Sequence, residues 1–188
     1  MFQSLVSSAL STVASLSLGP GGLPSSFKYT VSPSKTQTSW DSGIWALYSC
    51  TSKVDGSKAT LFLCDKKSSR PELVAAARNA MVRLRTLRHP NVLRCLEAVE
   101  TDSGVYIVTE EVVPLVDYEW DGGVLAQGQG PLCPMWGVYQ VLSALTFLVS
   151  DCKLEHGAVG PMSVFVTKTG DFRLGSFELH KITSYDIG

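Results

Sequence analysis

Short apolar runs rich in β-branched and aromatic residues predict five strands in the first part of the chain. Turn-forming residues, mainly Gly, Pro, Ser and Asp, separate these runs from one another. The predicted strands are Phe27–Val31, Ile44–Ser49, Ala59–Cys64, Leu93–Glu100 and Gly104–Glu111. A helical segment separates the third strand from the fourth, so a sheet with one long helix is expected here.

Two segments carry apolar residues at the spacing of an amphipathic helix. The first, Pro71–Arg88, begins with Pro and Glu, which suit a first helical turn, and is rich in Ala, Leu, Met and Arg. Its apolar stripe consists of Val74, Ala77, Met81, Leu84 and Leu87. The second, Pro134–Cys152, has the same spacing at Val138, Leu142, Leu145 and Leu148.

A hairpin is predicted near the end of the chain. Ser163–Lys168 is a short apolar strand, Thr169-Gly170 is a turn, and Asp171–Leu174 is the second strand. Between the strands of the first part and the second helix, Val116–Gly130 is Gly-rich and acidic, which indicates a surface loop.

The first eighteen residues have no charged side chain and a helical spacing of apolar residues. This segment, Met1–Leu18, is therefore expected to be an amphipathic helix that packs on its own domain, or a frayed terminus. The alternative is an interfacial helix that inserts apolar side chains into loosely packed lipid. Gly19–Ser26 is then a linker by its Gly, Pro and Ser content. If Met1–Leu18 binds lipid, the residues that contact the membrane would be Phe2, Leu5, Val6, Leu10 and Val13.

Composition narrows the class of protein. The length of 188 residues, with 45% apolar and 18% charged residues, is typical of one globular unit. The net charge of −1 gives no basic field for nucleic acid. Five cysteines are scattered without a C-x-x-C pair, which favours reduced thiols in the cytoplasm over disulfides or a zinc site. No apolar run is long enough to cross a membrane.

Three motifs stand in an order that is typical of protein kinases. They are TLRHPNV at Thr86–Val92, IVTEEVVPL at Ile107–Leu115 and HGAVGPMSVF at His156–Phe165. Together with a Leu-Gly pair where kinases carry D-F-G, they resemble the SCY-like family of catalytically inactive kinases. The resemblance covers about Phe27–Leu179, most of the chain.

The resemblance implies an α+β, protein kinase-like fold. Its small lobe would be a five-stranded antiparallel sheet with one long helix, followed by an incomplete, mainly helical large lobe. The implied organisation is an N-terminal helix over 1–18, a linker over 19–26, a small lobe with hinge over 27–115, and the truncated start of a large lobe over 116–188.

Five positions that carry kinase chemistry are replaced on this resemblance. Phe62 stands at the position of the phosphate-pairing Lys and Ala80 at that of its Glu partner. Ala158 replaces the catalytic base, whereas Ser163 and Ser176 replace the two metal-binding residues. An alanine accepts no proton, and neutral hydroxyls are poor substitutes for magnesium-binding carboxylates. The chain is therefore expected to be a pseudokinase, with no catalytic residue, cofactor or metal site.

The apolar residues that remain suggest a structural role for the same region. Leu84, Cys95, His156 and Phe177 match the four side chains that an active-type kinase stacks between its lobes. Phe62 and Phe165 are expected to fill the space of the adenine ring from opposite sides of the cleft.

The resemblance implies a scaffold or adaptor in intracellular vesicle traffic. Trafficking or coat proteins would be its partners, and its location would be cytoplasmic or peripheral on Golgi or endosomal membranes. One alternative is a divergent kinase that retains ATP binding or weak phosphotransfer. Another is a membrane-surface protein that uses its N-terminal helix. Fold alone does not separate the first two of these functions.

Overall fold

The computed structural model describes residues 22–119, 134–178 and 181–182. The predicted helix at Met1–Leu18, with its five proposed membrane-contacting residues, lies outside these ranges. The same holds for most of the predicted loop Val116–Gly130, although its first two residues belong to a short 3-10 helix, η1 (Leu115–Asp117).

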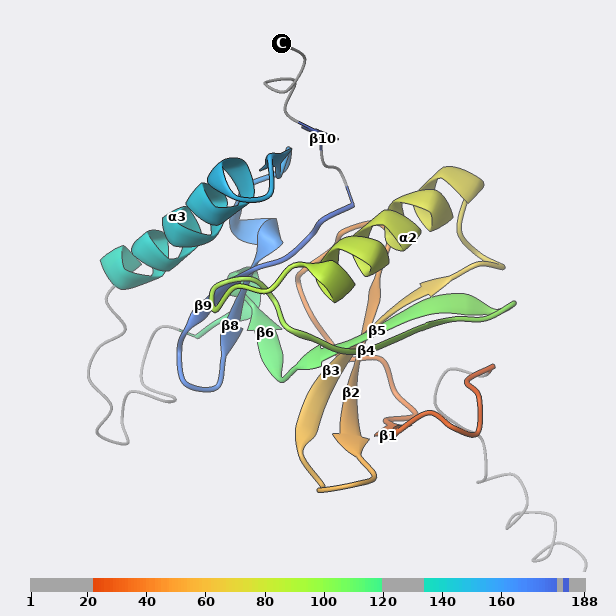
Figure 1. The fold of residues 1–188 in the computed structure, drawn as a ribbon. Helices are drawn as coiled ribbons and strands as arrows, with labels where there is room; N and C mark the ends of the chain where they lie inside the picture. The colour runs from red at the N-terminus through yellow and green to blue at the C-terminus, as the bar shows by residue number, and fades with distance from the viewer. Residues whose placement is uncertain (1–21, 120–133, 179–180, 183–188) are drawn as a thin grey trace, which may run out of the picture.

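A five-stranded antiparallel sheet forms the first half of the described structure. In spatial order its strands are β1 (Tyr29–Val31), β2 (Ala46–Ser52), β3 (Lys58–Asp65), β5 (Gly104–Glu110) and β4 (Cys95–Glu100). Figure 1 shows helix α2 lying across one face of this sheet. The predicted antiparallel sheet with one long helix is thus confirmed.

The sheet differs from the prediction mainly at the ends of its first two strands. Phe27 was predicted to begin a strand, but its backbone N–H donates to Pro24 in a turn, and β1 starts two residues later. Ile44 was also predicted to begin a strand, but its N–H donates to the Ser42 side chain, and β2 starts at Ala46. Local side-chain and turn hydrogen bonds compete with strand pairing at both places.

Strand β3 is buried on both faces, and its side chains alternate between two cores. Phe62 and Cys64 face the core that α2 covers. Leu61 and Leu63 face a second core on the other side of the sheet, which Phe27 and Tyr106 help to build. The alternation directs the Phe62 side chain toward α2 and the second half of the chain.

Helix α2 (Pro71–Thr86) ends two residues before the predicted end at Arg88. Leu87 already has an extended backbone, and the guanidinium of Arg88 donates to the carbonyl oxygens of Leu84 and Leu87. These bonds satisfy acceptors that the end of a helix leaves unpaired. All five residues of the predicted apolar stripe are buried.

The second half of the described structure consists of one helix and short strands. Strands β6, β8 and β9 form a three-stranded antiparallel sheet, and β7 pairs with β10. The elements are β6 (Val112–Pro114), α3 (Pro134–Ser150), β7 (Leu154–Glu155), the 3-10 helix η3 (Pro161–Ser163), β8 (Val164–Thr167), β9 (Phe172–Leu174) and β10 (Lys181–Ile182). The predicted hairpin is present as β8 and β9, whereas β6, β7 and β10 were missed because each is only two or three residues long.

The buried face of α3 coincides only in part with the stripe that the sequence suggested. Of the four stripe residues, Val138 and Leu142 are more than half exposed, whereas Leu145 packs against the core and Leu148 is buried. Ala144, which is not in the stripe, is buried as well. Gln140 is also buried: its side chain donates to Asp171 and accepts from the backbone N–H of Phe172. These polar bonds to the hairpin fix the rotation of α3.

Backbone pairing joins the two halves of the fold. The segment between α2 and β4 forms an isolated parallel bridge to β9, at Val92 and Leu174. Leu93 donates to the Leu174 carbonyl at 2.9 Å, and Leu174 donates to that of Asn91 at 2.8 Å. The position of β9 is therefore coupled directly to the C-terminal end of α2.

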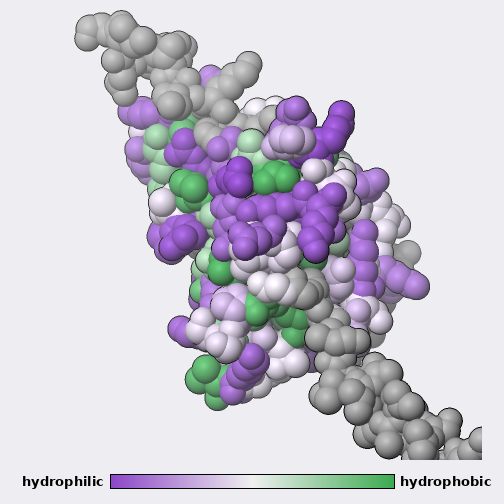
Figure 2. All heavy atoms as spheres, turned by 90° about the vertical axis from the view of Figure 1, so that its right-hand side faces the viewer, coloured by the Kyte–Doolittle hydropathy of each residue, from purple (hydrophilic) through white to green (hydrophobic). Residues whose placement is uncertain are grey.

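Figure 2 shows the side of the molecule on the right of Figure 1, where hydrophilic side chains predominate among the described residues. On the surface, Glu100 pairs with Lys66 at 2.6 Å and with Arg78 at 2.8 Å. Lys66 lies four residues after Phe62, and this pairing holds it outside the interior. It does not substitute for the missing phosphate-pairing Lys.

Candidate functional site

Three aromatic rings meet around the two residues, Phe62 and Phe165, that the sequence analysis expected to fill a kinase-like cleft. Phe62 on β3 contacts Phe165 on β8, with ring centroids 5.4 Å apart. Trp40, from the loop between β1 and β2, packs edge-on against both rings, at 6.0 Å from Phe62 and 5.5 Å from Phe165. All three side chains are at most 5% exposed. The structure thus brings together the two residues predicted to fill the cleft and adds Trp40, which the sequence analysis missed.

A second tryptophan extends this cluster to a half-buried carboxyl group. Trp45 packs edge-on against Phe62 at 6.2 Å, and its indole N–H donates to the Glu178 carboxylate. Burial raises the pKa of Glu178, and the bond from Trp45 opposes that shift in part. The contact joins residues 133 positions apart in the chain. Glu178 therefore holds the two halves together rather than facing an open metal site.

The loop that carries Trp40 is fixed to the second half of the fold. The Trp40 indole N–H donates to the Met162 carbonyl at 2.7 Å. The Ser39 backbone N–H donates to Asp117 at 2.7 Å, and the Thr38 hydroxyl donates to the same carboxylate. Burial raises the pKa of Asp117, but these hydrogen bonds outweigh it and the net shift is downward. In a kinase the corresponding loop covers the phosphates; here it is tied down over aromatic rings.

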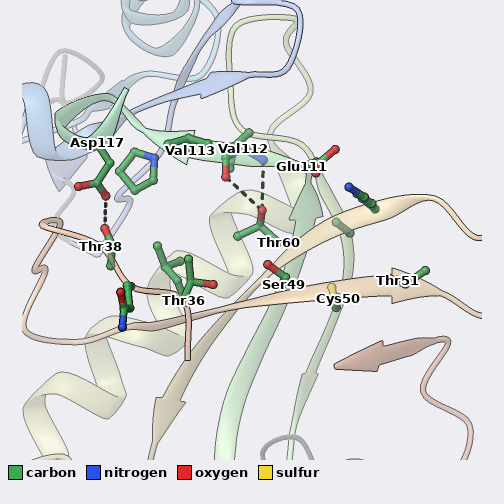
Figure 3. Close-up of a pocket in the computed structure, with 15 residues that line it drawn as sticks. Thr36, Thr38, Ser49, Cys50, Thr51, Thr60, Glu111, Val112, Val113 and Asp117 are labelled. Atoms are coloured by element: carbon green, nitrogen blue, oxygen red, sulfur yellow. Dashed lines mark hydrogen bonds between the residues drawn. The ribbon is translucent and has the colours of Figure 1, made fainter. Parts of the chain in front are cut away.

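A cavity of about 460 Å³ remains beside the filled region and is drawn in Figure 3. It lies between β2, β3 and the hinge, which is the segment 111–114 that follows β5. In its wall the Thr60 hydroxyl accepts from the Val112 N–H at 3.1 Å and donates to the Val112 carbonyl at 3.3 Å. The Thr60 hydroxyl thus engages both hinge groups of Val112 and would compete for them with the edge of a heterocyclic ring.

The five replaced positions carry no charge in the structure. Ala80 is 1% exposed on α2, in the same core as Phe62. Ser163 is buried, and its hydroxyl donates to the Gly160 carbonyl at 2.8 Å. The Ser176 hydroxyl donates to the Met162 carbonyl, and Ala158 offers no side-chain ligand. Among the residues that the structure describes, no group of three or more His, Cys, Asp or Glu side chains could hold a metal ion.

The four residues predicted to stack between the lobes lie in or against one core. Leu84 and Phe177 belong to it and are 5% and 2% exposed. His156 packs edge-on against Phe177, with ring centroids 4.9 Å apart. Cys95 is only partly buried and lies at the margin of the core. The stack is therefore well packed around Phe177 and looser at Cys95.

His156 is held as a neutral imidazole. Its Nε2 lies 2.6 Å from the Gly175 carbonyl, to which it donates, and its Nδ1 accepts from the Ala158 backbone N–H. Burial lowers the pKa of His156, and the bond to Gly175 only partly offsets this effect. Protonation of Nδ1 would place two N–H donors, those of His156 and Ala158, against each other. His156 is therefore a structural residue rather than a base.

We expect His156 to make the domain less stable in acid. Its folded-state pKa is lowered, so the unfolded chain binds the extra proton first as the pH falls below about 6.5. The stability that neutral His156 confers is present above that pH and is lost as the pH falls toward the folded-state pKa. Urea denaturation of the wild type and His156→Gln between pH 7.5 and 5 should show a shallower decline in the variant. Parallel declines would contradict this role.

Gly175 allows Phe165 to reach its position. A Cβ atom at residue 175 would lie 2.6 Å from the Phe165 ring, closer than atoms normally pack. Gly175→Ala should therefore lower the free energy of unfolding by about 1–3 kcal/mol through overpacking. Gly160→Ala is a matched control, because a Cβ there meets no atom within 4 Å and the backbone is extended. Equal effects of the two substitutions in urea denaturation would contradict the close approach.

Sequence reasoning missed four contributors to this site: Trp40, Trp45, Thr60 and Glu178. The sequence did carry a signal for Trp40 and Trp45. They flank Gly43, the one glycine in the loop that corresponds to the glycine-rich loop of kinases. Thr60 and Glu178 gave no such signal, since each depends on a partner more than fifty residues away.

Comparison with known proteins identifies relatives but no matching family model. The chain is 37% identical over 153 residues to Probable inactive serine/threonine-protein kinase scy1 of Dictyostelium discoideum, covering 81% of this chain and 18% of that protein. It is 35% identical to mouse Protein-associating with the carboxyl-terminal domain of ezrin, over 66% of this chain and 15% of that protein. Human SCY1-like protein 2 is 22% identical, over 71% and 16%. The chain thus spans less than a fifth of the length of each of these three relatives.

Proposed function

Because the chain belongs to the SCY-like family and carries an inactive protein kinase-like domain, we propose that it acts as a scaffold that binds other proteins. The observation that supports this is the interior of the cleft, which Trp40, Phe62 and Phe165 fill with packed rings. Phosphoryl transfer depends on positioned charge, and the five matching positions offer none. What remains is a rigid fold with surfaces for partners.

The proposed setting is vesicle traffic on the cytoplasmic side of Golgi or endosomal membranes, with trafficking or coat proteins as partners. The resemblance to SCY-like adaptors supports this setting. The name of the mouse relative records association with the carboxyl-terminal domain of ezrin, which makes a protein partner the natural class to test. Within the described residues, no helix is long and apolar enough to cross a membrane. Attachment through Met1–Leu18 belongs to the same proposal.

We expect the protein not to bind ATP. Thermal unfolding of the full chain should give the same Tm with and without millimolar ATP, in the presence of magnesium or manganese. A ligand at a hundred times its Kd would stabilise the fold by about 2.7 kcal/mol, which such a scan detects readily. An active protein kinase in the same buffers is the control. A metal-dependent rise in Tm would show an open cleft and return the divergent-kinase alternative to first place.

The scaffold role itself is tested by direct binding. Calorimetry with the purified carboxyl-terminal domain of ezrin, and with purified coat-protein appendage domains, should give at least one saturable complex. The Gly160→Ala variant should bind equally well, because it alters no packed contact. Absence of binding to any of these proteins would count against the proposed partners, independently of the result with ATP.

A further inference from the structure

A basic groove runs along the outer side of the hinge, away from the filled cleft. It consists of two adjoining hollows of about 510 and 640 Å³. Both are lined by Arg94, Glu110 and Arg173, so they form one continuous channel. One end is walled by Arg88 and its neighbours after α2. The other end reaches the turns of the β2–β3 and β8–β9 hairpins.

The charge of this groove is opposite in sign to that of the whole chain. Five cationic side chains line it, against two carboxylates, which leaves an excess of three positive charges. The chain as a whole has a formal net charge of −1. The cations are Lys58, Arg88, Arg94, Lys168 and Arg173.

Most of these cations are not neutralised by the fold. Arg173 pairs with Glu110 at 3.3 Å, and the Arg94 backbone N–H donates to the same carboxylate at 3.1 Å. Arg88 donates to two backbone carbonyl oxygens and forms no ion pair with any described carboxylate. For Lys58, Lys168 and the guanidinium of Arg94, no hydrogen bond or ion pair to another described residue is seen, and all three residues are exposed.

We propose that this groove binds an extended acidic segment of a partner protein. The inference rests on the scaffold function proposed above and specifies the chemistry of one partner. Carboxylates of the segment would pair with Arg94, Lys58 and Lys168, which come from both halves of the fold. An occupied groove would therefore hold the two halves together from the outside, as Glu178 and Asp117 do within.

Two features favour a peptide over a membrane surface. The charges line a concave channel, whereas a flat lipid surface contacts protruding cations. Glu110 and Glu111 also lie in its wall, and their carboxylates can accept backbone N–H groups, which a peptide offers and a phosphate does not. Leu96 is 38% exposed in the same wall and offers contact to one apolar side chain. The segment is thus expected to alternate acidic residues with a small number of apolar ones.

The test measures binding of the full chain to a fluorescent peptide of alternating glutamate and serine with one central leucine. Its analogue with glutamine in place of glutamate is the ligand control. Arg94→Glu should weaken binding of the acidic peptide about fivefold to tenfold, because it removes one charge pair and adds a repulsion. Raising the salt concentration from 50 to 300 mM should weaken wild-type binding by a similar factor, since exposed charges are screened.

Lys67→Glu is the matched control variant. Lys67 is exposed and lies beyond the far end of β3, roughly 20 Å or more from Lys58 at about 3.3 Å per residue. It changes the net charge as Arg94→Glu does but leaves the groove intact. An equal loss of affinity in both variants, or equal binding of the glutamine analogue, would overturn the proposal.

Vesicles containing phosphatidylserine and free inorganic phosphate complete the design. The proposal predicts no difference between wild type and Arg94→Glu with either of them. Binding of vesicles or phosphate through Arg94 without binding of the acidic peptide would overturn the assignment in favour of a lipid or phosphate ligand. Failure of the peptide to bind, together with binding of a partner in calorimetry, would reject the groove and leave the scaffold function standing.

Discussion

Replacing Phe62 with alanine should lower the free energy of unfolding by about 3–5 kcal/mol, the range for removing a buried aromatic ring. Phe62 is 5% exposed and contacts three other rings, those of Trp40, Trp45 and Phe165. These residues come from both halves of the fold and are fixed by backbone and side-chain hydrogen bonds, so the cavity cannot collapse easily. Urea denaturation followed by tryptophan fluorescence measures the change, since two of the neighbours are tryptophans.

Two further variants separate loss of the ring from other causes. Phe62→Leu keeps most of the apolar volume and should cost less than about 1.5 kcal/mol. Val54→Ala removes apolar atoms from a side chain that is 82% exposed, so it should change stability by less than about 0.5 kcal/mol. A loss for Phe62→Ala no larger than that for Val54→Ala would show that the cleft is not filled by this ring.

The same variant also addresses nucleotide binding. Removing the ring opens space in the cleft but restores neither the missing Lys at residue 62 nor the Glu at residue 80. Thr60 still occupies both hinge groups of Val112. We therefore expect Phe62→Ala to be less stable and still unresponsive to ATP. On this expectation, several independent positions disfavour nucleotide binding, rather than one obstructing side chain.

Local sequence pattern was enough to predict the sheet and its helix. The apolar stripe of α2 is long and regular, and all five of its residues are buried. Strand β3 has an uninterrupted apolar run from Ala59 to Cys64, typical of a strand covered on both faces. Element ends were less predictable, because a single turn bond at Phe27 or Ile44 competes with a ladder bond of similar strength.

Packing of α3 was less predictable because its sequence is apolar around most of its circumference. Any of several faces could be buried on hydrophobicity alone. The choice is made by Gln140, which bonds to the hairpin residues Asp171 and Phe172, and by Gly137, which leaves room for the Phe172 ring. A polar residue and a glycine thus orient the helix, and neither contributes to a hydrophobic stripe.

The sequence revealed the missing catalytic residues more readily than the long-range contacts that take their place. Each loss is visible at one position, as at Ala158 or Ser176, because the family pattern names the residue expected there. The replacement is a contact between distant positions, such as Trp40 with Met162 or Trp45 with Glu178. Such pairs have no local sequence signature. Only the folded structure shows that packed side chains and hydrogen bonds occupy the region where the catalytic residues are missing.

Phe177 provides the second large effect that we expect. Phe177→Ala should lower the free energy of unfolding by about 3–5 kcal/mol, because the ring is 2% exposed and packs on His156 and the core that includes Leu84. The loss should exceed that for Cys95→Ala, since Cys95 is only partly buried at the margin of the core. Urea denaturation of both variants at pH 7.5 makes the comparison.

A link to His156 distinguishes a stacked pair from two independent core residues. His156 is kept neutral by burial, and Phe177 forms part of what buries it. Removing that ring admits water, so the pKa of His156 should move back toward its ordinary value, and the decline of stability in acid should become shallower. Phe177→Leu, which keeps the site dry, should retain the steeper decline. An unchanged pH dependence in Phe177→Ala would mean that the ring adds apolar volume to the core without controlling the ionisation of His156.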